Sequence, residues 1–420
     1  MKLLVVGGGG REHAIIRKLK ENPTVEKIYA LPGNGGMEEA VCVNIGAKDI
    51  PAIVEFATTH GVDYAVVAPD DPLVLGAVDA LEAAGIPCFG PCAKAAMIEG
   101  SKVYAKCLMK KYGIPTARYE TFDDPDDALD YLRLADYPIV IKADGLALGK
   151  GVVIPADYPE AERELRAIMC EKKFGKSGDR IVIEEFLEGP EVSVLAFTDG
   201  KTLVPMVSSM DHKRALDGDK GLNTGGMGTV APNPYYTPEI AARCEKEIFL
   251  PTIRAMTAEG RPFRGCLYFG LMLTKDGPKV IEYNCRFGDP ETQVVLPLLE
   301  SDLLTVMMAT TNGTLGEIEV KFSSRHACCV VLASGGYPEK YETGKEITIP
   351  DELKQSVYVA GAKRTADGKL VTSGGRVLGA VATGETLPEA IANAYQIADR
   401  ISFAGKFCRR DIGARALKAK

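Results

Sequence analysis

Residues 280–293 read Val-Ile-Glu-Tyr-Asn-Cys-Arg-Phe-Gly-Asp-Pro-Glu-Thr-Gln, and this stretch decides the expected fold. In a strand, Glu282 and Asn284 share one face, because successive side chains alternate. Two neighbouring oxygen donors suit Mg²⁺, which proteins usually share with nucleotide phosphates. Arg286 follows where its guanidinium could bind a phosphate, and Gly288-Asp289-Pro290 predicts a turn. An edge strand with solvated polar residues is the alternative, and this stretch alone leaves both open.

The composition is that of an ordinary soluble protein with several domains. A chain of 420 residues predicts two to four domains, and 46% apolar with 25% charged residues is typical of globular proteins. The net charge of −7 argues against a general nucleic-acid-binding surface. Eleven scattered cysteines without a Cys-x-x-Cys pair predict reduced thiols in a cytoplasmic protein. Neither a signal peptide nor an apolar run of membrane-spanning length is apparent.

The N-terminal pattern predicts a parallel sheet with an anion site at one edge. A buried-strand run at 2–6 leads into a glycine turn at 7–10 and a helical pattern, which together form an anion cradle. The dinucleotide fingerprint fails, because Glu12 or His13 occupies the place of its third glycine, and so a dehydrogenase is not expected. Alternating strands and helices would bring Gly8–Arg11, Pro32–Asn34 and Asp70–Pro72 to the same edge. For Asp70, helix capping is an equal alternative.

Residues 138–154 predict a strand, a glycine-rich loop and a second strand. The loop is not a Walker A motif, because the glycine spacing differs and a strand follows where a helix should. Backbone N–H groups and Lys150 could bind phosphates from this loop, with Lys142 reaching them from the first strand. A solvent-facing hairpin is the alternative. A further strand at 181–187 ends in acids that could accept hydrogen bonds from a nucleoside.

Residues 211–228 are charged and glycine-rich without any periodicity, which we interpret as excluding a helix or strand. Such a long loop in a compact domain is usually functional, and its order of cations followed by Asn223 and glycines predicts an anion site. His212 is either a phosphate donor or a loop histidine with internal hydrogen bonds. From about residue 324 the pattern changes to a separate β-rich unit, with a helix that starts at Thr386 and is capped with help from Glu389.

Taken together, these motifs resemble the ATP-grasp superfamily and, within it, the phosphoribosylamine–glycine ligase family. The resemblance covers essentially the whole chain. It is carried by residues 5–13, 142–151, 211–214, 223–228, 286–293, 373–379 and 409–413. The chain departs from the family pattern at Ala68-Pro69-Asp70-Asp71, where Gly-Pro-Glu is usual, and less so at Gly35-Gly36. Both departures lie in the N-terminal crevice.

The resemblance implies an α/β fold with an α+β ATP-grasp core. The expected domains are an N-terminal Rossmann-like domain (1–102), a central ATP-grasp domain (103–118 and 188–323), a mobile lid subdomain (119–187) and a small β-rich C-terminal domain with a helix (324–420). The implied activity is ATP-dependent ligation of glycine to 5-phosphoribosylamine through glycyl phosphate, in purine biosynthesis. Another ATP-grasp ligase or carboxylase is the alternative, and a catalytically inactive nucleotide-binding protein is a second.

The implied cofactors are ATP and Mg²⁺ (or Mn²⁺), and the implied partners are small-molecule substrates without nucleic acid or membrane. The protein is expected to be cytoplasmic and a monomer or weak homodimer. The metal ligands implied are Glu282 and Asn284, and the catalytic residues are Asp211, His212, Lys213, Asn223 and Arg286. The ATP-binding residues implied are Lys106, Lys142, Gly145, Gly149, Lys150, Gly151, Glu184, Glu185, Phe186, Leu187 and Glu191. The substrate-binding residues implied are Gly8, Gly9, Gly10, Arg11, Asn34, Asp70, Gly225, Gly226, Met227, Asp289 and Pro290.

Overall fold

The computed structural model describes residues 1–146 and 151–419, and it begins with the parallel sheet that the sequence predicts. The strand order is β3-β2-β1-β4-β5, and every pairing is parallel. Its strands are β1 (Lys2–Gly7), β2 (Lys27–Pro32), β3 (Val41–Cys42), β4 (Tyr64–Val67) and β5 (Cys88–Phe89). The helices of this region are α1 (Gly10–Lys20), α2 (Ile50–Thr59), α3 (Asp70–Val74) and α4 (Ala77–Ala83). Residues 3–6 are fully buried on both faces, which explains their continuous apolar run.

The central domain is built on an antiparallel sheet with the order β11-β10-β16-β17. Its strands are β10 (Glu191–Thr198), β11 (Leu203–Pro205), β16 (Gly265–Thr274) and β17 (Gly277–Asn284). The predicted turn at 275–278 is confirmed, because Thr274 pairs with Gly277. The helical elements are α5 (Ala93–Gly100), α6 (Lys102–Tyr112), α9 (Pro238–Cys244), η2 (Glu245–Phe249), α10 (Leu250–Ala258), α11 (Thr292–Val295), η3 (Leu296–Leu298), α12 (Leu303–Asn312) and η4 (Leu315–Glu317).

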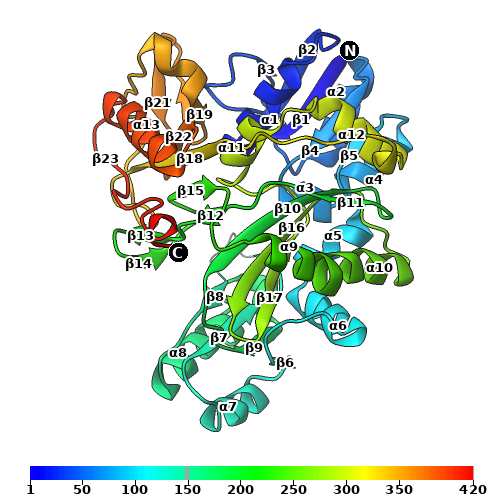
Figure 1. Cartoon of the computed structure of the whole chain (residues 1–420), viewed down its shortest axis with the longest axis vertical. Coiled ribbons are helices and arrows are strands. Elements are labelled where there is room, and N and C mark those ends of the chain that lie inside the picture. Colours follow the sequence, from blue (N-terminus) through cyan, green and yellow to red (C-terminus); the bar gives the residue numbers. More distant parts are fainter. Residues whose placement is uncertain (147–150, 420) are drawn as a thin grey trace.

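Residues 119–185 form a subdomain at the opposite end of the molecule from the N-terminal sheet (Figure 1). Its strand order is β6-β9-β7-β8, and two helices pack on the sheet around a separate apolar core. The elements are β6 (Tyr119–Phe122), α7 (Pro125–Arg133), β7 (Ile139–Ala143), β8 (Val152–Val153), α8 (Tyr158–Met169), η1 (Gly175–Gly178) and β9 (Ile181–Glu185). The predicted strand–loop–strand is confirmed by the antiparallel pair β7–β8, and Asp124 caps α7 as expected.

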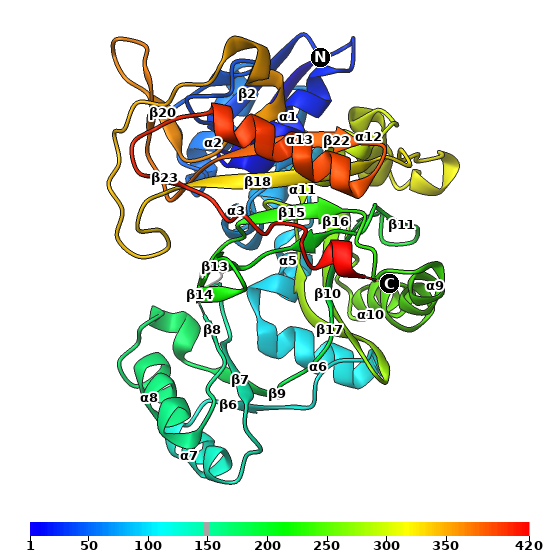
Figure 2. The same ribbon diagram turned by 60° about the vertical axis from the view of Figure 1, so that its left-hand side comes forward.

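The C-terminal domain shares a sheet with the central domain. Long strands β18 and β22 pair with each other, and β18 also pairs with β15, which in turn pairs with β12 (Figure 2). The two strands from the central region are β12 (Met210–Asp211) and β15 (Gly228–Ala231). The remaining elements are β18 (His326–Ser334), η5 (Asp351–Ser356), β19 (Val357–Val359), β20 (Ala362–Arg364), β21 (Leu370–Thr372), β22 (Arg376–Gly384), α13 (Leu387–Arg400), β23 (Lys406–Phe407) and η6 (Ala416–Lys418).

Residues 211–228 correct one prediction, because the exclusion of strands there is wrong. The segment contains the hairpin of β13 (Arg214–Leu216) and β14 (Lys220–Asn223), between β12 and β15. Arg214 pairs with Asn223 and Leu216 pairs with Lys220. Strands this short, with an irregular register and polar residues on both faces, leave no alternating pattern for sequence reasoning to detect.

The cysteine prediction is confirmed as far as oxidation is concerned. All eleven cysteines are free, and six of them are buried. Within residues 1–146 and 151–419, no helix combines the length and the apolar character needed to cross a bilayer.

Candidate active site

Glu282 lies on β17 beside a cluster of lysines. Its Oε1 is 3.4 Å from Lys213 Nζ, and this lysine, with Lys142 and Lys102 further away, lowers the pKa of Glu282 to about 2. The same carboxylate raises the pKa of Lys213. The site therefore presents a permanent carboxylate surrounded by cations, which suits a metal–polyphosphate complex better than an isolated metal ion.

Glu99, which the sequence analysis did not select, supports the end of β17. The carboxylate is 8% exposed on α5, and it accepts hydrogen bonds from the backbone N–H of Cys285 at 2.7 Å and from Arg286 Nη2 at 2.9 Å. Burial raises the pKa of Glu99. A charged pair this well buried fixes the direction of the Arg286 guanidinium. No local motif marks Glu99, because its partners lie almost two hundred residues away in the chain.

The predicted metal ligands fit a cation whose coordination is completed by phosphate. Across the described ranges, no three His, Cys, Asp or Glu side chains converge on one point. In the orientation that satisfies its hydrogen bonds, the Asn284 amide nitrogen donates to Glu99 Oε1 at 3.0 Å and to the Tyr283 carbonyl at 3.1 Å. This leaves the amide oxygen, together with the Glu282 carboxylate, as the two protein ligands. Mg²⁺ at nucleotide sites commonly uses only one or two carboxylate-type ligands.

Lys142 joins three strands that the predicted nucleotide site requires to be close. From β7 its Nζ lies 2.9 Å from Glu184 Oε1 on β9 and donates to the Ile281 carbonyl on β17 at 2.9 Å. Lys142 therefore links the strand that precedes the glycine-rich loop to the strand that carries Glu282. Gly145 and Gly151 lie at the two described ends of that loop, whereas Gly149 and Lys150 lie outside the described residues.

Lys102 and Lys106, the first two of the four lysines on α6, have different surroundings. Lys106 Nζ donates to Thr116 Oγ1 at 2.7 Å and lies 3.2 Å from Glu184, and burial lowers the pKa of Lys106 to about 8. Lys106 thus forms a buried ion pair that fixes the position of the Glu184 carboxylate. Lys102, one turn earlier, donates to the Gly145 carbonyl at 3.1 Å and lies in the field of Glu282. The sequence analysis assigned ATP binding to Lys106 and gave Lys102 no role, although the i, i+4 spacing puts both lysines on one side of the helix.

The residues predicted to contact the nucleoside lie where β9 ends. Glu185 is 2.8 Å from Arg118 Nε and 3.4 Å from Lys279 Nζ. Phe186 is 39% exposed, which is unusual for a phenylalanine beside a buried strand. Leu187 is half-buried, and Glu191 begins β10 and lines the pocket described next.

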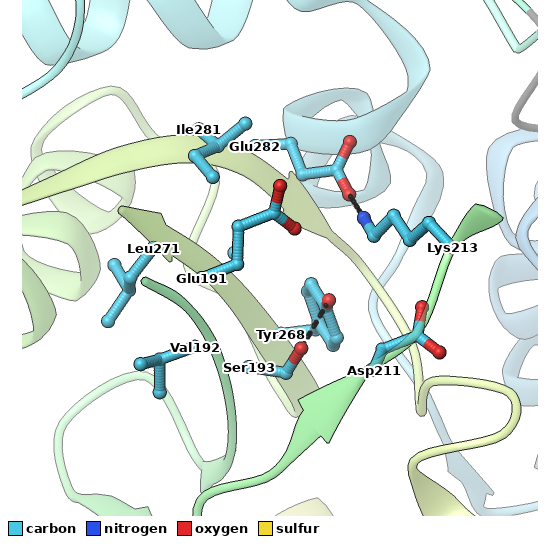
Figure 3. A pocket seen from close by; sticks show the side chains of 10 residues that line it. Glu191, Val192, Ser193, Asp211, Lys213, Tyr268, Leu271, Ile281 and Glu282 are labelled. Atoms are coloured by element: carbon cyan, nitrogen blue, oxygen red, sulfur yellow. Dashed lines mark hydrogen bonds and ion pairs between the residues drawn. The ribbon is translucent and has the colours of Figure 1, made fainter. Parts of the chain in front are cut away.

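A small polar pocket lies between β10, β16 and the segment in which Asp211 ends β12 and Lys213 precedes β13 (Figure 3). In Figure 3 the Glu191 and Glu282 carboxylates and the Lys213 ammonium group point into the same space. Tyr268 Oη is 2.8 Å from Ser193 Oγ and donates to Glu291 Oε1 at 3.2 Å. Burial and the neighbouring Glu291 raise the pKa of Asp211. Ser193 and Tyr268 were missed because they sit in apolar strands that read as core.

The residues predicted to bind the sugar phosphate come together in a second part of the cleft. Arg11 Nη1 donates to the Phe287 carbonyl at 3.1 Å, and the Arg11 backbone N–H donates to Asp289 Oδ2 at 3.3 Å. The glycines here are closely packed, with no room for a side chain. At Gly8 an added Cβ would lie 2.4 Å from the Gly33 carbonyl oxygen, and at Gly9 it would lie 3.2 Å from Asp289 Oδ2. At Gly10 it would lie 2.6 Å from Gln293 Nε2, and at Gly226 it would lie 2.5 Å from Pro290. Gly225 lies against the Arg376 guanidinium, and Asp70 Oδ2 is 3.8 Å from Arg286 Nη2.

Four other predicted residues are occupied by contacts within the protein. Asn34 Nδ2 donates to the Gly8 and Val359 carbonyls at 2.9 and 2.8 Å, so its amide holds the crevice wall together. His212 Nδ1 lies 3.0 Å from the Gly228 carbonyl, and Nε2 accepts from the Gly413 N–H at 3.1 Å. Of the two roles considered for His212, the structure therefore supports the internally bonded one. Met227 is fully buried in the core, and Asn223 ends β14.

Three models of one protein family match this chain in succession. The phosphoribosylglycinamide synthetase N domain matches residues 1–99, the ATP-grasp (A) domain matches 100–292 and the C domain matches 327–415. Together they account for most of the chain.

The chain belongs to the phosphoribosylglycinamide synthetase family.

Full-length relatives of this synthetase family member carry a consistent name. The chain is 49% identical over 416 residues to the phosphoribosylamine–glycine ligase of Caldanaerobacter subterraneus, covering 99% of this chain and 100% of that protein. It is 48% identical to the ligase of the same name from Clostridium acetobutylicum, covering 98% and 99%. These alignments extend through all three family domains.

Two solved structures resemble this synthetase family member over nearly its whole length. The phosphoribosylamine–glycine ligase of Thermotoga maritima has a TM-score of 0.85 at 37% identity and covers 98% of this chain and 100% of its own. The biotin carboxylase domain of 2-oxoglutarate carboxylase from Hydrogenobacter thermophilus, crystallised with MgADP, has a TM-score of 0.74 at 17% identity, covering 97% and 91%. The second likeness bears on the fold alone. The predicted α/β fold with an ATP-grasp core is confirmed.

Proposed function

We propose that this protein is a phosphoribosylamine–glycine ligase, which joins glycine to 5-phosphoribosylamine at the expense of ATP in purine biosynthesis. The observation that carries the proposal is the grouping of Lys142, Glu282, Asn284 and Arg286 around the end of β17, in a chain whose full length aligns with ligases of that name. An inactive nucleotide-binding relative would have no need to keep this combination of charges in place.

The chemistry requires activation of a carboxylate, because oxide is too poor a leaving group for an amine to displace. In the proposed first step, a glycine carboxylate oxygen attacks the γ-phosphorus of ATP, and the bond from that phosphorus to the ADP oxygen breaks. In the second step, the amine of phosphoribosylamine attacks the acyl carbon of glycyl phosphate, loses a proton and expels inorganic phosphate. The products are ADP, phosphate and the glycinamide ribonucleotide. Phosphoryl transfer of this kind depends mainly on positioning and charge neutralisation.

The residues divide this work according to their positions. Lys142 and Lys102 would bind phosphate oxygens of the nucleotide from β7 and α6, and Phe186 would pack on the base at the end of β9. Glu282 and Asn284 would hold Mg²⁺ or Mn²⁺, which when bound neutralises charge on the phosphates. Arg286, fixed by Glu99, would stabilise the charge that develops on the transferred phosphoryl group, a contribution that is typically about 3 kcal/mol.

The polar pocket beside Lys213 suits glycine in both size and charge. It offers the Glu191 carboxylate to an ammonium group and Lys213 to a carboxylate. The crevice of Gly8–Arg11 with Asp289 would receive the sugar phosphate through backbone N–H groups and Arg11.

We further propose the four domains with the boundaries given above, a cytoplasmic location and a monomeric or weakly dimeric state.

The decisive experiment measures ADP release with purified protein across a panel of amino acids, with and without freshly generated phosphoribosylamine. We expect release that requires both glycine and the phosphoribosylamine, with formation of one glycinamide ribonucleotide per ADP. Release that depends on a different acid, or on bicarbonate, would instead assign another ATP-grasp ligase or a carboxylase. If no ADP were released under any condition although the protein still bound ATP, the assignment of this protein as an enzyme would be rejected.

A further inference from the structure

The hairpin β13–β14 carries Lys213 at its base but has little of its own to hold it in place. Its two strands pair at only two positions, and Leu216 and Leu222 are 53% and 52% exposed. A two-stranded hairpin of this kind is at best marginally stable in water. The position of Lys213, immediately before β13, must therefore depend on contacts from elsewhere in the molecule.

Arg409, in the segment that follows β23, supplies the main contact. Its side chain is only 1% exposed, and Nη1 donates to the Arg214 carbonyl at 3.1 Å and to Asp219 Oδ1 at 3.0 Å. The Nε and Nη2 groups bind both oxygens of Asp411 at 2.7 and 2.8 Å. The guanidinium thus joins the first strand of the hairpin, its turn and the C-terminal segment. A planar group with donors on several edges is suited to such a junction, and lysine is not.

Other groups of the same segment bind the hairpin at both of its ends. At the turn, the Gly218 N–H donates to Asp411 Oδ2 and the Arg410 N–H donates to Asp217 Oδ1, both at 2.8 Å. At the base, the Gly413 N–H donates to His212 Nε2 at 3.1 Å. Figure 1 shows the C-terminal end of the chain lying beside the hairpin. The whole segment from 409 to 413 therefore follows the hairpin from turn to base.

We propose that Arg409 is a positioning residue, which acts through the hairpin to hold Lys213 beside Glu282 in the active site. Of the described residues that line the polar pocket, none forms a hydrogen bond or ion pair with Arg409, whose link to the pocket is the carbonyl of Arg214, the neighbour of Lys213. Loss of this contact releases the hairpin into conformations in which Lys213 leaves Glu282. The observed kcat then falls to the wild-type value multiplied by the fraction of molecules that keep Lys213 beside Glu282. The inference rests on the proposed function only in its kcat measurement, which assumes that the protein catalyses the ligase reaction.

The test compares Arg409→Ala and Arg409→Lys with Arg410→Ala as the matched control. Arg410 is the next residue, but its side chain is 55% exposed and pairs with Asp399 on α13 instead of the hairpin. Limited trypsin digestion with mass spectrometry reports opening of the hairpin directly, because Lys213, Arg214 and Lys220 are cleavage sites. We expect Arg409→Ala to speed cleavage at these sites about tenfold and to lower kcat about tenfold, with the KM for ATP changed less than about twofold.

Arg409→Lys should give intermediate values, and Arg410→Ala should match the wild type in both readouts. Unchanged hairpin cleavage and kcat in Arg409→Ala would overturn the proposal, as would cleavage accelerated equally throughout the chain. Should Arg409→Ala fail to fold, Asp219→Asn tests the same contact from the other side, since Asp219 is 38% exposed and the buried Arg409 keeps Asp411 as its ionic partner. The digestion needs no substrate, so a failure of the ligase assignment would leave this result interpretable.

Discussion

Glu282 sits among the ammonium groups of Lys213, Lys142 and Lys102, and the nearest of them lowers its pKa to about 2. At the scale of single residues, this makes the charge of Glu282 more informative to remove than that of Arg286. Removing Arg286 would leave Glu99 buried without its partner, and the loss of stability would obscure the loss of chemistry. Glu282 is 30% exposed at its side chain, so its charge can be removed without preventing folding.

We predict that Glu282→Gln lowers kcat about 10²-fold or more and lowers the thermal unfolding midpoint without preventing folding, because the lowered pKa of Glu282 means that its charge also stabilises the fold. The reason for the lower kcat is the loss of the anionic metal ligand and of the partner of Lys213. Steady-state assays with saturating ATP and glycine measure the effect. Asp276→Asn, in the exposed turn that precedes β17, is the control and should keep full activity. Activity of Glu282→Gln within a few-fold of the wild type would contradict the metal-ligand assignment.

Among single residues, sequence reasoning found those that belong to contiguous motifs. Lys142, Glu282, Asn284 and Arg286 were predicted from their local patterns, and the structure groups them around the end of β17. Their roles stay predictions. Glu99, Ser193 and Tyr268 were missed because their significance arises only from tertiary contacts. Sequence reasoning chose Lys106 for the nucleotide, although nothing in the local pattern favours it over Lys102 on the same helix.

At the scale of elements, the turn between β1 and α1 is the feature most sensitive to a single added methyl group. A Cβ on Gly8 would lie 2.4 Å from the Gly33 carbonyl oxygen, and both partners are backbone, so neither can move cheaply. The two turns at the edge of the parallel sheet therefore pack directly against each other. This close approach explains why glycine is needed there.

We predict that Gly8→Ala separates the two turns and raises the KM for phosphoribosylamine about tenfold, with the KM for ATP nearly unchanged. Overpacking of this kind typically costs about 1–3 kcal/mol, which the N-terminal domain can absorb while its crevice is displaced. Initial rates at varied concentrations of each substrate separate the two constants. Gly46→Ala is the matched control, because nothing lies within 4 Å of a Cβ there. Equal changes in both KM values would place the glycine turn outside the sugar-phosphate site.

Elements with a strong apolar pattern were predicted well, and the hairpin at 214–223 was not. The strands at 2–6, 139–143 and 181–185 and the pair β16–β17 have buried residues that repeat or run together, which is the signal that sequence reasoning uses. Of the hairpin's own side chains only Ala215 is buried, and Arg409 and its neighbours hold the hairpin from a distant part of the chain. Its stability is a tertiary property, so no local pattern could reveal it.

At the scale of the whole molecule, His212 connects the central region to the C-terminal segment through both ring nitrogens. Burial lowers the pKa of His212 to about 4, from an unfolded value of about 6.5. Between these two pH values the unfolded chain binds a proton that the folded protein does not. The contribution to stability is therefore complete above about pH 6.5 and is lost as the pH falls towards 4.

We predict that the free energy of unfolding of the wild type falls more between pH 7 and pH 4.5 than that of His212→Gln, by roughly 3 kcal/mol. The glutamine cannot titrate, so this part of the pH dependence disappears. Denaturant titrations at the two pH values measure the difference. His60→Gln, which replaces an exposed histidine, should keep the wild-type dependence. Parallel curves for the wild type and His212→Gln would show that the histidine is not buried as a neutral ring.

The domain order was accessible from sequence, but the way in which the domains join was not. Composition and motif order predicted an N-terminal parallel sheet, a central ATP-grasp core and a β-rich C-terminal unit. Backbone pairing between strands far apart in the chain leaves no trace in either segment, and so the sheet formed by β12, β15, β18 and β22 was not foreseen.

Because β15 pairs with β18, a protein truncated at the boundary near residue 324 would lose part of the sheet that joins the two domains. The backbone groups of residues 228–231 that face residues 327–330 would have no partner in a fragment that ends before β18. Such a fragment would carry a bare, apolar strand edge, ready to recruit the same edge of another copy. The last hundred residues thus act as a built-in cover against self-association, whatever else they contribute.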